Sequence, residues 1–205
     1  MLTSLDVSSL VVDKLSNEAR GQNTVITGFY LDFAAREEQS AAGVLGSLLR
    51  QAVGGMGRIS EEIWRAFQEH EKTMGGCRLQ LVDIVKMLQA ITSVQPTFMC
   101  IDGLDECVGV QRAKLLGSLK EILEKSPRTR IFATGRPYIR ADVEKRLGGQ
   151  VASVSVGPIR GDIITYIHAR LGEDETQDAM DESLEADILE EIPKNIPEMC
   201  VVPWR

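Results

Sequence analysis

The chain has 205 residues, of which 43% are hydrophobic and 26% are charged, and its formal net charge is −7. This balance is typical of a globular chain with room for one domain or slightly more. The apolar runs are too short and too often broken by charge to span a membrane, and no signal segment opens the chain. We therefore expect no membrane attachment, no secretion and a cytoplasmic location.

The negative charge is concentrated towards one end of the sequence. Residues 173–205 hold eleven acidic residues against Lys194 and Arg205, whereas residues 1–172 hold 19 acidic and 21 basic residues. We interpret residues 1–172 as the core and residues 173–205 as an acidic linker followed by the start of a helical region, with an acidic interaction tail as the alternative. The near-neutral core has no cluster of Lys and Arg, which argues against binding to nucleic acid.

Cysteine and histidine are scarce and scattered. None of the four cysteines forms a Cys-x-x-Cys pair, and neither of the two histidines has a partner at metal-ligand spacing. In an intracellular chain such cysteines are typical of buried thiols, rather than of disulfides or zinc ligands. We therefore expect neither a zinc site nor histidine-based catalysis.

The first part of the chain alternates between helical and strand patterns. Apolar residues at helical spacing predict a helix over 2–15, and the β-branched and aromatic run 24–33 predicts a strand. Ser40 is placed as the N-cap of a helix over 40–53. A further helix is predicted over 60–72, because acidic residues lie in the first turn of that segment.

The same alternation continues through the rest of the chain. The remaining elements are predicted, in chain order, as a helix at 79–91, a strand at 97–101, a helix at 109–125, a strand at 129–134, a helix at 138–147, a strand at 151–156, and helices at 162–171 and 184–196. Strands that alternate with helices indicate β-α-β crossovers. They predict an α/β fold in which helices cover both faces of a mainly parallel sheet.

Charged side chains stand where two of these strands end. Asp102, Asp105 and Glu106 follow the strand at 97–101 in FMCIDGLDEC, and Arg136 follows the strand at 129–134 in ATGRP. Because ligands of such sheets bind outside the carboxyl ends of the strands, we expect the four side chains to line one crevice. Carboxylates there suit a hydrated Mg²⁺ that also binds phosphate oxygens, and a fixed guanidinium suits a phosphate.

Each of these residues also has a purely structural interpretation. Asp102 with the glycine that follows is typical of a turn after a strand. Asp105 or Glu106 would be suitable as the N-cap of the next helix. Arg136 would then be no more than an ion-pair partner for them. The order of the motifs on adjacent elements favours the nucleotide interpretation over these alternatives.

The succession of an apolar strand with Asp-Gly-Leu-Asp-Glu, a helix, and an apolar strand with Thr-Gly-Arg-Pro resembles the Walker B and sensor motifs of NACHT-type P-loop NTPases of the STAND class. It is most similar to the nephrocystin-like N-terminal domain of fungal NOD-like receptor and ankyrin-repeat proteins. Residues 28–53 resemble the second strand of that domain and its crossover, and the resemblance runs in motif order over residues 1–198. It implies a P-loop NTPase-like three-layer sandwich, with residues 1–172 as a partial NACHT core.

The resemblance also implies a role for each site residue. Asp102 would hold Mg²⁺ through water. Asp105 and Glu106 would orient or deprotonate the attacking water, and Arg136 would read the γ-phosphate. In the family, exchange and hydrolysis of ATP or GTP switch a signalling receptor between closed and oligomeric states. The implied partners are therefore the nucleotide, further copies of the chain and full-length relatives.

The phosphate-binding loop of the family, Gly-x-x-x-x-Gly-Lys-Ser/Thr, does not occur in the 205 residues. The glycine-rich stretches 43–50 and 53–60 both lack Gly-Lys-Ser/Thr. Residues 1–15 resemble the helix that directly follows this loop, so by resemblance the chain begins just after the Walker A motif and is truncated at both ends. We expect such a chain to be unable to bind or hydrolyse ATP appreciably, although its family consists of nucleotide hydrolases.

The strand that precedes this loop in the family lies between the sensor strand and the last strand of the sheet. Without it, a position between 129–134 and 151–156 would be vacant. Each buried and unpaired backbone group costs about 1–3 kcal/mol, which is severe against a total stability of roughly 5–15 kcal/mol. We expect residues 151–156 to close against 129–134, another segment to fill the position, or the chain to fold poorly.

Three interpretations of function remain. The chain is the core of a nucleotide-dependent signalling switch, a non-enzymatic remnant or decoy that pairs with full-length relatives through exposed sheet edges, or an incomplete gene model without activity of its own.

Overall fold

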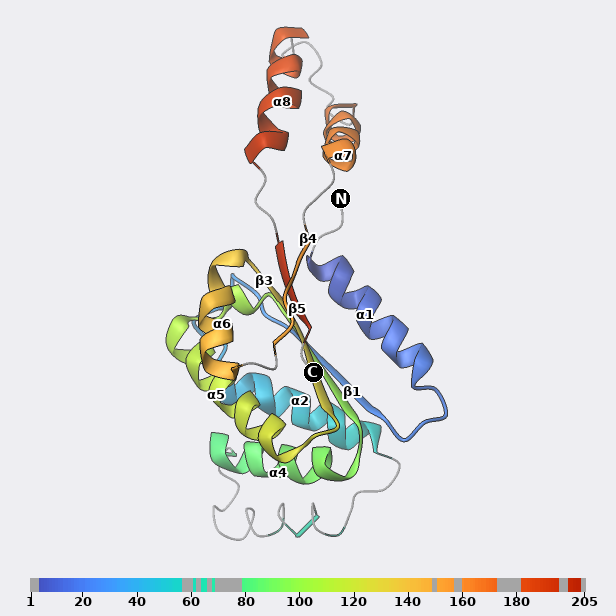
Figure 1. The fold of residues 1–205 in the computed structure, drawn as a ribbon, viewed down its shortest axis with the longest axis vertical. Coiled ribbons are helices and arrows are strands. Elements are labelled where there is room, and N and C mark those ends of the chain that lie inside the picture. Colours follow the sequence, from blue (N-terminus) through green and yellow to red (C-terminus); the bar gives the residue numbers. More distant parts are fainter. Residues whose placement is uncertain are drawn as a thin grey trace.

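The structure is a computed structural model that describes residues 4–56, 79–148, 151–156, 160–172, 182–195 and 199–203 and the single positions 61, 64, 65 and 68 (Figure 1). The helices are α1 (Ser4–Glu18), α2 (Ala41–Gly55), α4 (Leu81–Val94), α5 (Gly109–Lys125), α6 (Arg140–Leu147), α7 (Arg160–Gly172) and α8 (Glu182–Asn195), with the short 3₁₀ helices η1 (Leu104–Glu106) and η2 (Pro137–Ile139). The strands are β1 (Val25–Tyr30), β2 (Thr97–Asp102), β3 (Thr129–Gly135), β4 (Val154–Val156) and β5 (Met199–Pro203).

The strands form one sheet in the order β1-β2-β3-β5-β4. β1, β2 and β3 are parallel and in register, with Val25 opposite Thr97 and Thr97 opposite Thr129. β5 runs antiparallel to both β3 and β4. The predicted α/β fold is therefore confirmed, and its parallel part consists of three strands joined by crossover helices.

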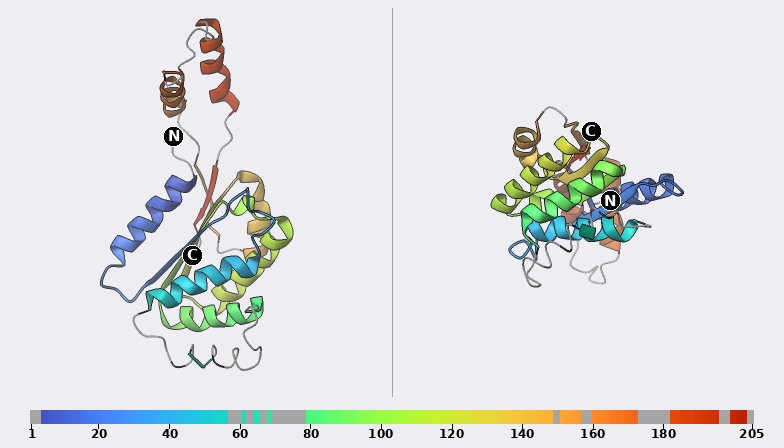
Figure 2. Two further views of the ribbon diagram at one scale, coloured as in Figure 1. Left: turned by 180° about the vertical axis from the view of Figure 1, so that it is seen from behind. Right: turned by 90° about the horizontal axis from the view of Figure 1, so that it is seen from below.

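Helices cover both faces of the parallel strands. Of the described helices, α1 lies against one face, and α2, α4, α5 and α6 lie on the other (Figures 1 and 2). Met99 and Ile101 of β2 belong to the hydrophobic core under the four helices, whereas Asp102 bonds to α1. The largest fully buried side chains are mainly leucine and isoleucine, among them Leu45, Leu48, Leu88, Ile91, Leu115 and Leu119. Burying each of them contributes about 1.5–3 kcal/mol.

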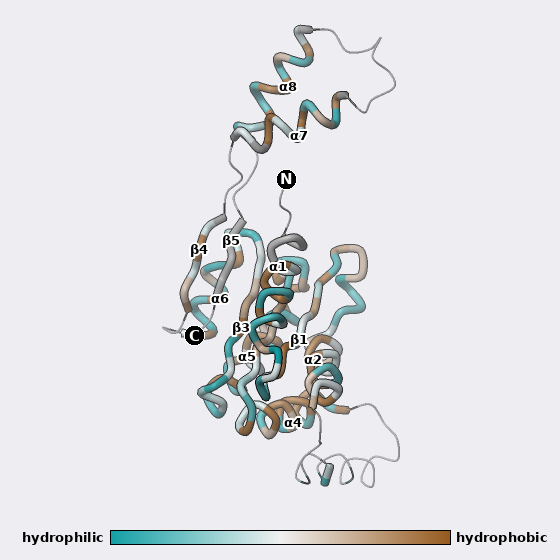
Figure 3. Tube along the Cα trace, turned by 90° about the vertical axis from the view of Figure 1, so that its right-hand side faces the viewer, coloured by the Kyte–Doolittle hydropathy of each residue, from teal (hydrophilic) through white to brown (hydrophobic). Residues whose placement is uncertain are grey.

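α7 and α8 project beyond the end of the sheet (Figures 1 and 3). β4 leads into α7 and α8 leads back to β5, so this excursion begins and ends in adjacent antiparallel strands. Ile163 and Ile167 of α7 are buried, and the two helices contact each other. Across the described ranges, none of the helices combines the length and the apolar character that crossing a bilayer requires.

β5 occupies the position between β3 and β4. Ala133 of β3 lies opposite Val202, and Ser155 of β4 lies opposite Cys200. The expectation that another segment fills this position is confirmed, and the expected direct closure of residues 151–156 against 129–134 is wrong. Residues 199–203 were not predicted as a strand, because five residues that include a proline carry little local signal.

Most predicted elements are present, with shifts at their ends. Ser40 is the N-cap of α2, since its Oγ accepts the Gly43 N–H at 3.1 Å. The strand predicted at 24–33 ends at Tyr30 because Asp32 begins a turn, in which its Oδ1 accepts the Ala34 N–H at 2.9 Å. The helix predicted at 60–72 lies largely outside the described residues. Cys100 and Cys107 are buried free thiols, as predicted, and burial raises the pKa of Cys100 to about 11.

The outer edge of β1 is covered by a side chain. The Gly28 N–H donates to Gln51 Oε1 at 2.9 Å, and Gln51 Nε2 donates to the Gly28 carbonyl oxygen at 2.8 Å. The amide of Gln51 thus supplies the two hydrogen bonds that a neighbouring strand would supply at this residue. An edge covered in this way is less able to pair with another chain.

Replacing Gln51 tests this edge. Gln51→Leu is expected to lower the free energy of unfolding by about 1 kcal/mol, because two backbone groups of β1 lose their partners. The measurement is urea unfolding, and Arg50→Leu, at the neighbouring exposed position of α2, is the matched control. Equal losses in the two variants would contradict this role of Gln51.

Candidate functional site

Gly103 turns the chain directly after β2. Its φ of 68° lies in the left-handed region that favours glycine. A Cβ at this position would stand 3.2 Å from the carbonyl oxygen of Leu31, which is backbone and cannot move aside easily. The Gly103 carbonyl oxygen accepts the Glu106 N–H at 2.8 Å, which starts η1. The turn predicted at Asp102 and Gly103 is therefore present, and it directs the following acidic residues to the carboxyl end of the sheet.

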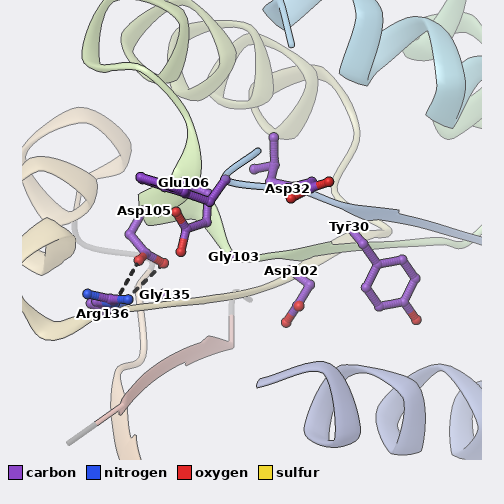
Figure 4. A pocket seen from close by; sticks show the side chains of 10 residues that line it. Tyr30, Asp32, Asp102, Gly103, Asp105, Glu106, Gly135 and Arg136 are labelled. Atoms are coloured by element: carbon purple, nitrogen blue, oxygen red, sulfur yellow. Dashed lines mark hydrogen bonds and ion pairs between the residues drawn. The ribbon is translucent and has the colours of Figure 1, made fainter. Parts of the chain in front are cut away.

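Asp102 is buried at the end of β2 on the side of α1 (Figure 4), with 5% of its surface exposed. Its Oδ1 accepts hydrogen bonds from Ser8 Oγ of α1 and from Thr134 Oγ1 of β3, each at 2.5 Å. A buried carboxylate is costly unless such donors compensate for the lost water. These two donors hold the carboxylate in one orientation.

Asp105 and Arg136 form an ion pair across the ends of β2 and β3 (Figure 4). Arg136 Nε lies 3.3 Å from Asp105 Oδ2, and the Arg136 N–H donates to Asp105 Oδ1 at 3.2 Å. The side chain of Asp105 is only 6% exposed, whereas that of Arg136 is 63% exposed. Among the described residues, no group bonds to the two terminal nitrogens of Arg136. The arginine is thus anchored at one end and available at the other.

The side-chain carboxylate of Glu106 has no hydrogen bond or ion pair with any described residue. It does not cap the next helix, and neither does Asp105. The N-cap of α5 is Val108, which makes no side-chain cap bond. The capping alternative is therefore wrong, and both carboxylates remain at the site.

The four predicted residues line one cavity of about 470 Å³ at the carboxyl ends of β1, β2 and β3, which we call the site cavity. Its lining is completed by the strand ends and the turn residues around them, namely Tyr30, Leu31, Asp32, Phe33, Gly103 and Gly135. The expected crevice is therefore present. It lies where ligands of parallel sheets bind.

The described residues contain no group of three or more side chains that could hold a metal ion by themselves. Mg²⁺ does not require one, since it keeps several waters and uses one or two carboxylates together with phosphate oxygens. Asp102 fits contact through water, because its Oδ1 already accepts two hydroxyl donors. Glu106 adds a second carboxylate to the same cavity.

Residues 6–136 match the family described as Nephrocystin 3, N-terminal. The match covers well over half of the chain. The chain belongs to this nephrocystin 3 N-terminal family. The matched region runs from α1 to Arg136 and contains all four predicted site residues of the nephrocystin-type domain. No curated protein and no solved structure matches the chain.

Two hydroxyl groups of the nephrocystin-type domain were missed by sequence reasoning. Thr134 lies inside the motif ATGRP, but a threonine at a strand end carries no signal of its own beside an arginine. Ser8 is one of several serines along α1, and nothing in the sequence distinguishes it. Both were found only because the fold brings them within bonding distance of Asp102.

Arg112 connects the end of the acidic turn to α6. Its Nη1 donates to the Cys107 carbonyl oxygen at 2.9 Å, and its Nε lies 3.3 Å from Asp142 Oδ2 of α6. Burial alone would raise the pKa of Asp142, but hydrogen bonds and charge from Arg146 and Arg112 outweigh it and hold that pKa below its usual value. The residue after η1 is thereby tied to α5 and α6.

The Asp142 carboxylate has a lower pKa in the folded than in the unfolded chain. It therefore stabilises the folded chain fully above the unfolded pKa of about 4. This contribution is lost as the pH falls through the folded pKa. Asp142→Asn is expected to lower the free energy of unfolding by up to about 1 kcal/mol near neutral pH and to have little effect in acid. Urea unfolding at neutral and acid pH measures it. Glu144→Gln, at an exposed ion pair of the same helix, is the control, and a loss independent of pH would refute the assignment.

Gly103→Ala tests the turn. We expect a loss of about 2 kcal/mol, because the left-handed φ is strained for alanine and the Leu31 carbonyl oxygen crowds the Cβ. Gly21→Ala is the matched control, since Gly21 also has a positive φ but a Cβ there would have no atom within 4 Å. Thermal unfolding compares the two, and a smaller loss at Gly103 than at Gly21 would show that the close approach is absent.

Proposed function

We propose that the chain carries the Mg²⁺- and γ-phosphate-facing part of a nucleotide-dependent signalling switch, the NACHT-type NTPase core of a NOD-like receptor in the cytoplasm. One observation carries the proposal. Asp102, Asp105, Glu106 and Arg136 come from the ends of adjacent parallel strands and meet around one cavity. Membership of the nephrocystin 3 N-terminal family supports it, because the match contains all four residues.

Asp102 is assigned to hold Mg²⁺ through water. Its burial and its two hydroxyl donors keep the carboxylate in one orientation at the cavity. When bound, Mg²⁺ supplies charge neutralisation at the phosphate oxygens. The protein's contribution is a carboxylate that is fixed before the nucleotide arrives, so that no side-chain entropy is lost on binding.

The two remaining carboxylates are assigned different parts of one task. Both oxygens of Asp105 face Arg136, so Asp105 orients the arginine. The carboxylate of Glu106 has no partner among the described residues and lines the cavity, so it is placed to orient the attacking water and take its proton.

Arg136 is assigned to read the γ-phosphate. Asp105 engages its Nε, and the side chain of Arg136 remains 63% exposed. Two parallel N–H donors match the oxygens of a phosphate group and also provide positive charge. A guanidinium held in this way loses little further freedom when phosphate binds.

The charge of the site cavity limits what this chain does alone. Among the described residues that line it, Asp32, Asp102, Asp105 and Glu106 are acidic and Arg136 is basic. This excess of negative charge repels a triphosphate unless Mg²⁺ intervenes. The backbone cradle and lysine of a phosphate-binding loop supply most of the grip on phosphate, and the 205 residues contain no such motif. We therefore propose that the chain by itself does not bind or hydrolyse ATP appreciably.

The alternative of a decoy module that pairs through exposed sheet edges has less support. Gln51 occupies both backbone groups of Gly28 on the outer edge of β1, and the other outer strand, β4, has three residues. Within the described part of the sheet, neither edge is a long unprotected strand.

The test is a titration of the chain with Mg²⁺–ATP and with Mg²⁺–GTP. Binding is measured by calorimetry at micromolar nucleotide and by NMR at millimolar nucleotide. We expect no heat at micromolar concentration and, at millimolar concentration, shifts confined to the amides around Gly103, Gly135 and Arg136. Arg136→Ala is expected to weaken the millimolar binding about tenfold, because it removes charge-assisted hydrogen bonds.

Arg128→Ala is the matched control, since Arg128 is exposed at the opposite end of β3. It is expected to leave the titration unchanged. Stoichiometric ATP binding at micromolar concentration would overturn the proposal that the chain alone is inactive. Absence of any response at millimolar nucleotide, or equal effects of the two arginine variants, would overturn the assignment of the site.

A further inference from the structure

We propose that Thr134 is a positioning residue, whose one hydroxyl group fixes both the Asp102 carboxylate and the Gly103 turn and so sets the carboxylates against Arg136. The ligand that the carboxylates and Arg136 bind rests on the function proposed above. The positioning itself rests on contacts among the described residues.

The hydrogen bonds of Thr134 have a defined direction. The Gly103 N–H donates to Thr134 Oγ1 at 3.0 Å, and the hydroxyl of Thr134 donates to Asp102 Oδ1. A hydroxyl has one hydrogen and accepts through its lone pairs, so both bonds form at once without competition. Thr134 is only 1% exposed, so water has little access to this arrangement.

These bonds act at the point where the strands separate. The backbone pairing of β2 with β3 ends with Ile101 opposite Ala133. One step further along, the hydroxyl of Thr134 provides the connection between the strands instead. Thr134 precedes Arg136 by two residues, and the Gly103 carbonyl oxygen starts η1 by accepting the Glu106 N–H. One hydroxyl therefore links the strand that carries the arginine to the turn that carries the acids.

Ser8 provides an internal comparison. Its Oγ donates to the same oxygen, Asp102 Oδ1, but comes from α1 and has no bond to Gly103. Ser8→Ala therefore removes one donor from Asp102 and leaves the turn intact. If Thr134 acted only as a donor to the carboxylate, the two hydroxyl groups would have the same effect on the site.

Thr92 provides a control for the cost of losing a buried hydroxyl. It is also fully buried, and its Oγ1 pairs with Ser126 Oγ at 2.6 Å. Neither of these residues lines the site cavity. Thr92→Val thus removes a comparable hydrogen bond without touching the turn or the carboxylates.

The experiment compares the wild-type chain with Thr134→Val, Thr134→Ser, Ser8→Ala and Thr92→Val. Exchange of the Gly103 amide hydrogen is measured by NMR, and Mg²⁺ with inorganic tripolyphosphate is the binding probe. We expect a slowly exchanging Gly103 amide in the wild type, at least tenfold faster exchange in Thr134→Val, and slow exchange in the other three variants. Probe affinity should fall about tenfold in Thr134→Val, which corresponds to about 1.4 kcal/mol, and be restored in Thr134→Ser.

Several outcomes would overturn the positioning role. One is a fast-exchanging Gly103 amide in the wild type. This measurement needs no variant, so it tests the proposal even if Thr134→Val fails to fold. Others are unchanged exchange in folded Thr134→Val, or equal losses of probe affinity in Thr134→Val and Thr92→Val. If Gly103 loses protection only in Thr134→Val while the wild type ignores the probe, the positioning role is supported and the proposed nucleotide function fails.

Discussion

The site depends on the parallel register of β2 and β3. Adjacent parallel strands end at the same edge of a sheet, so residues that follow them are brought together whatever lies between them in the chain. Here the register places Ile101 opposite Ala133, and the next residues of each strand are Asp102 and Thr134, which bond to each other. The Asp105–Arg136 ion pair lies just beyond. The features of the cavity that come from β2, β3 and the turns after them follow from this alignment.

The sheet can hold that alignment because its inner strands have partners on both sides. β3 would lose backbone partners along one edge without β5, and unpaired buried groups are among the most costly defects in a fold. β5 provides the partners antiparallel to β3, and it is itself paired with β4. Gln51 provides them for one residue of β1 at the opposite edge. The same requirement, that buried N–H and C=O groups find partners, is thus met by a strand at one position and by a side chain at another.

The charges of the site are arranged unequally. The side chain of Asp105 is buried and paired with Arg136, and Asp102 is buried and bonded to two hydroxyl groups. The carboxylate of Glu106 has no partner among the described residues. Under the function proposed above, such different surroundings suit the carboxylates to different parts of one reaction, one for orientation, one for holding a cation and one for accepting a proton. Arg136 is also only partly engaged, since its Nε is held by Asp105 while its side chain stays largely exposed. In the proposed function, this division favours sensing of phosphate over tight binding of it.

The sequence by itself determined most of the succession of helices and strands, the α/β fold, and the four residues at the strand ends, because hydrophobic period and strand polarity are local properties. It did not predict Ser8, Thr134 or β5. A serine on a helix and a threonine at a strand end become partners of Asp102 only when elements that are 94 and 32 residues away in the chain pack beside it. Residues 199–203 become a strand because β3 and β4 offer unpaired backbone on both sides. The tertiary structure decided these points, since each depends on a long-range contact that no local pattern contains.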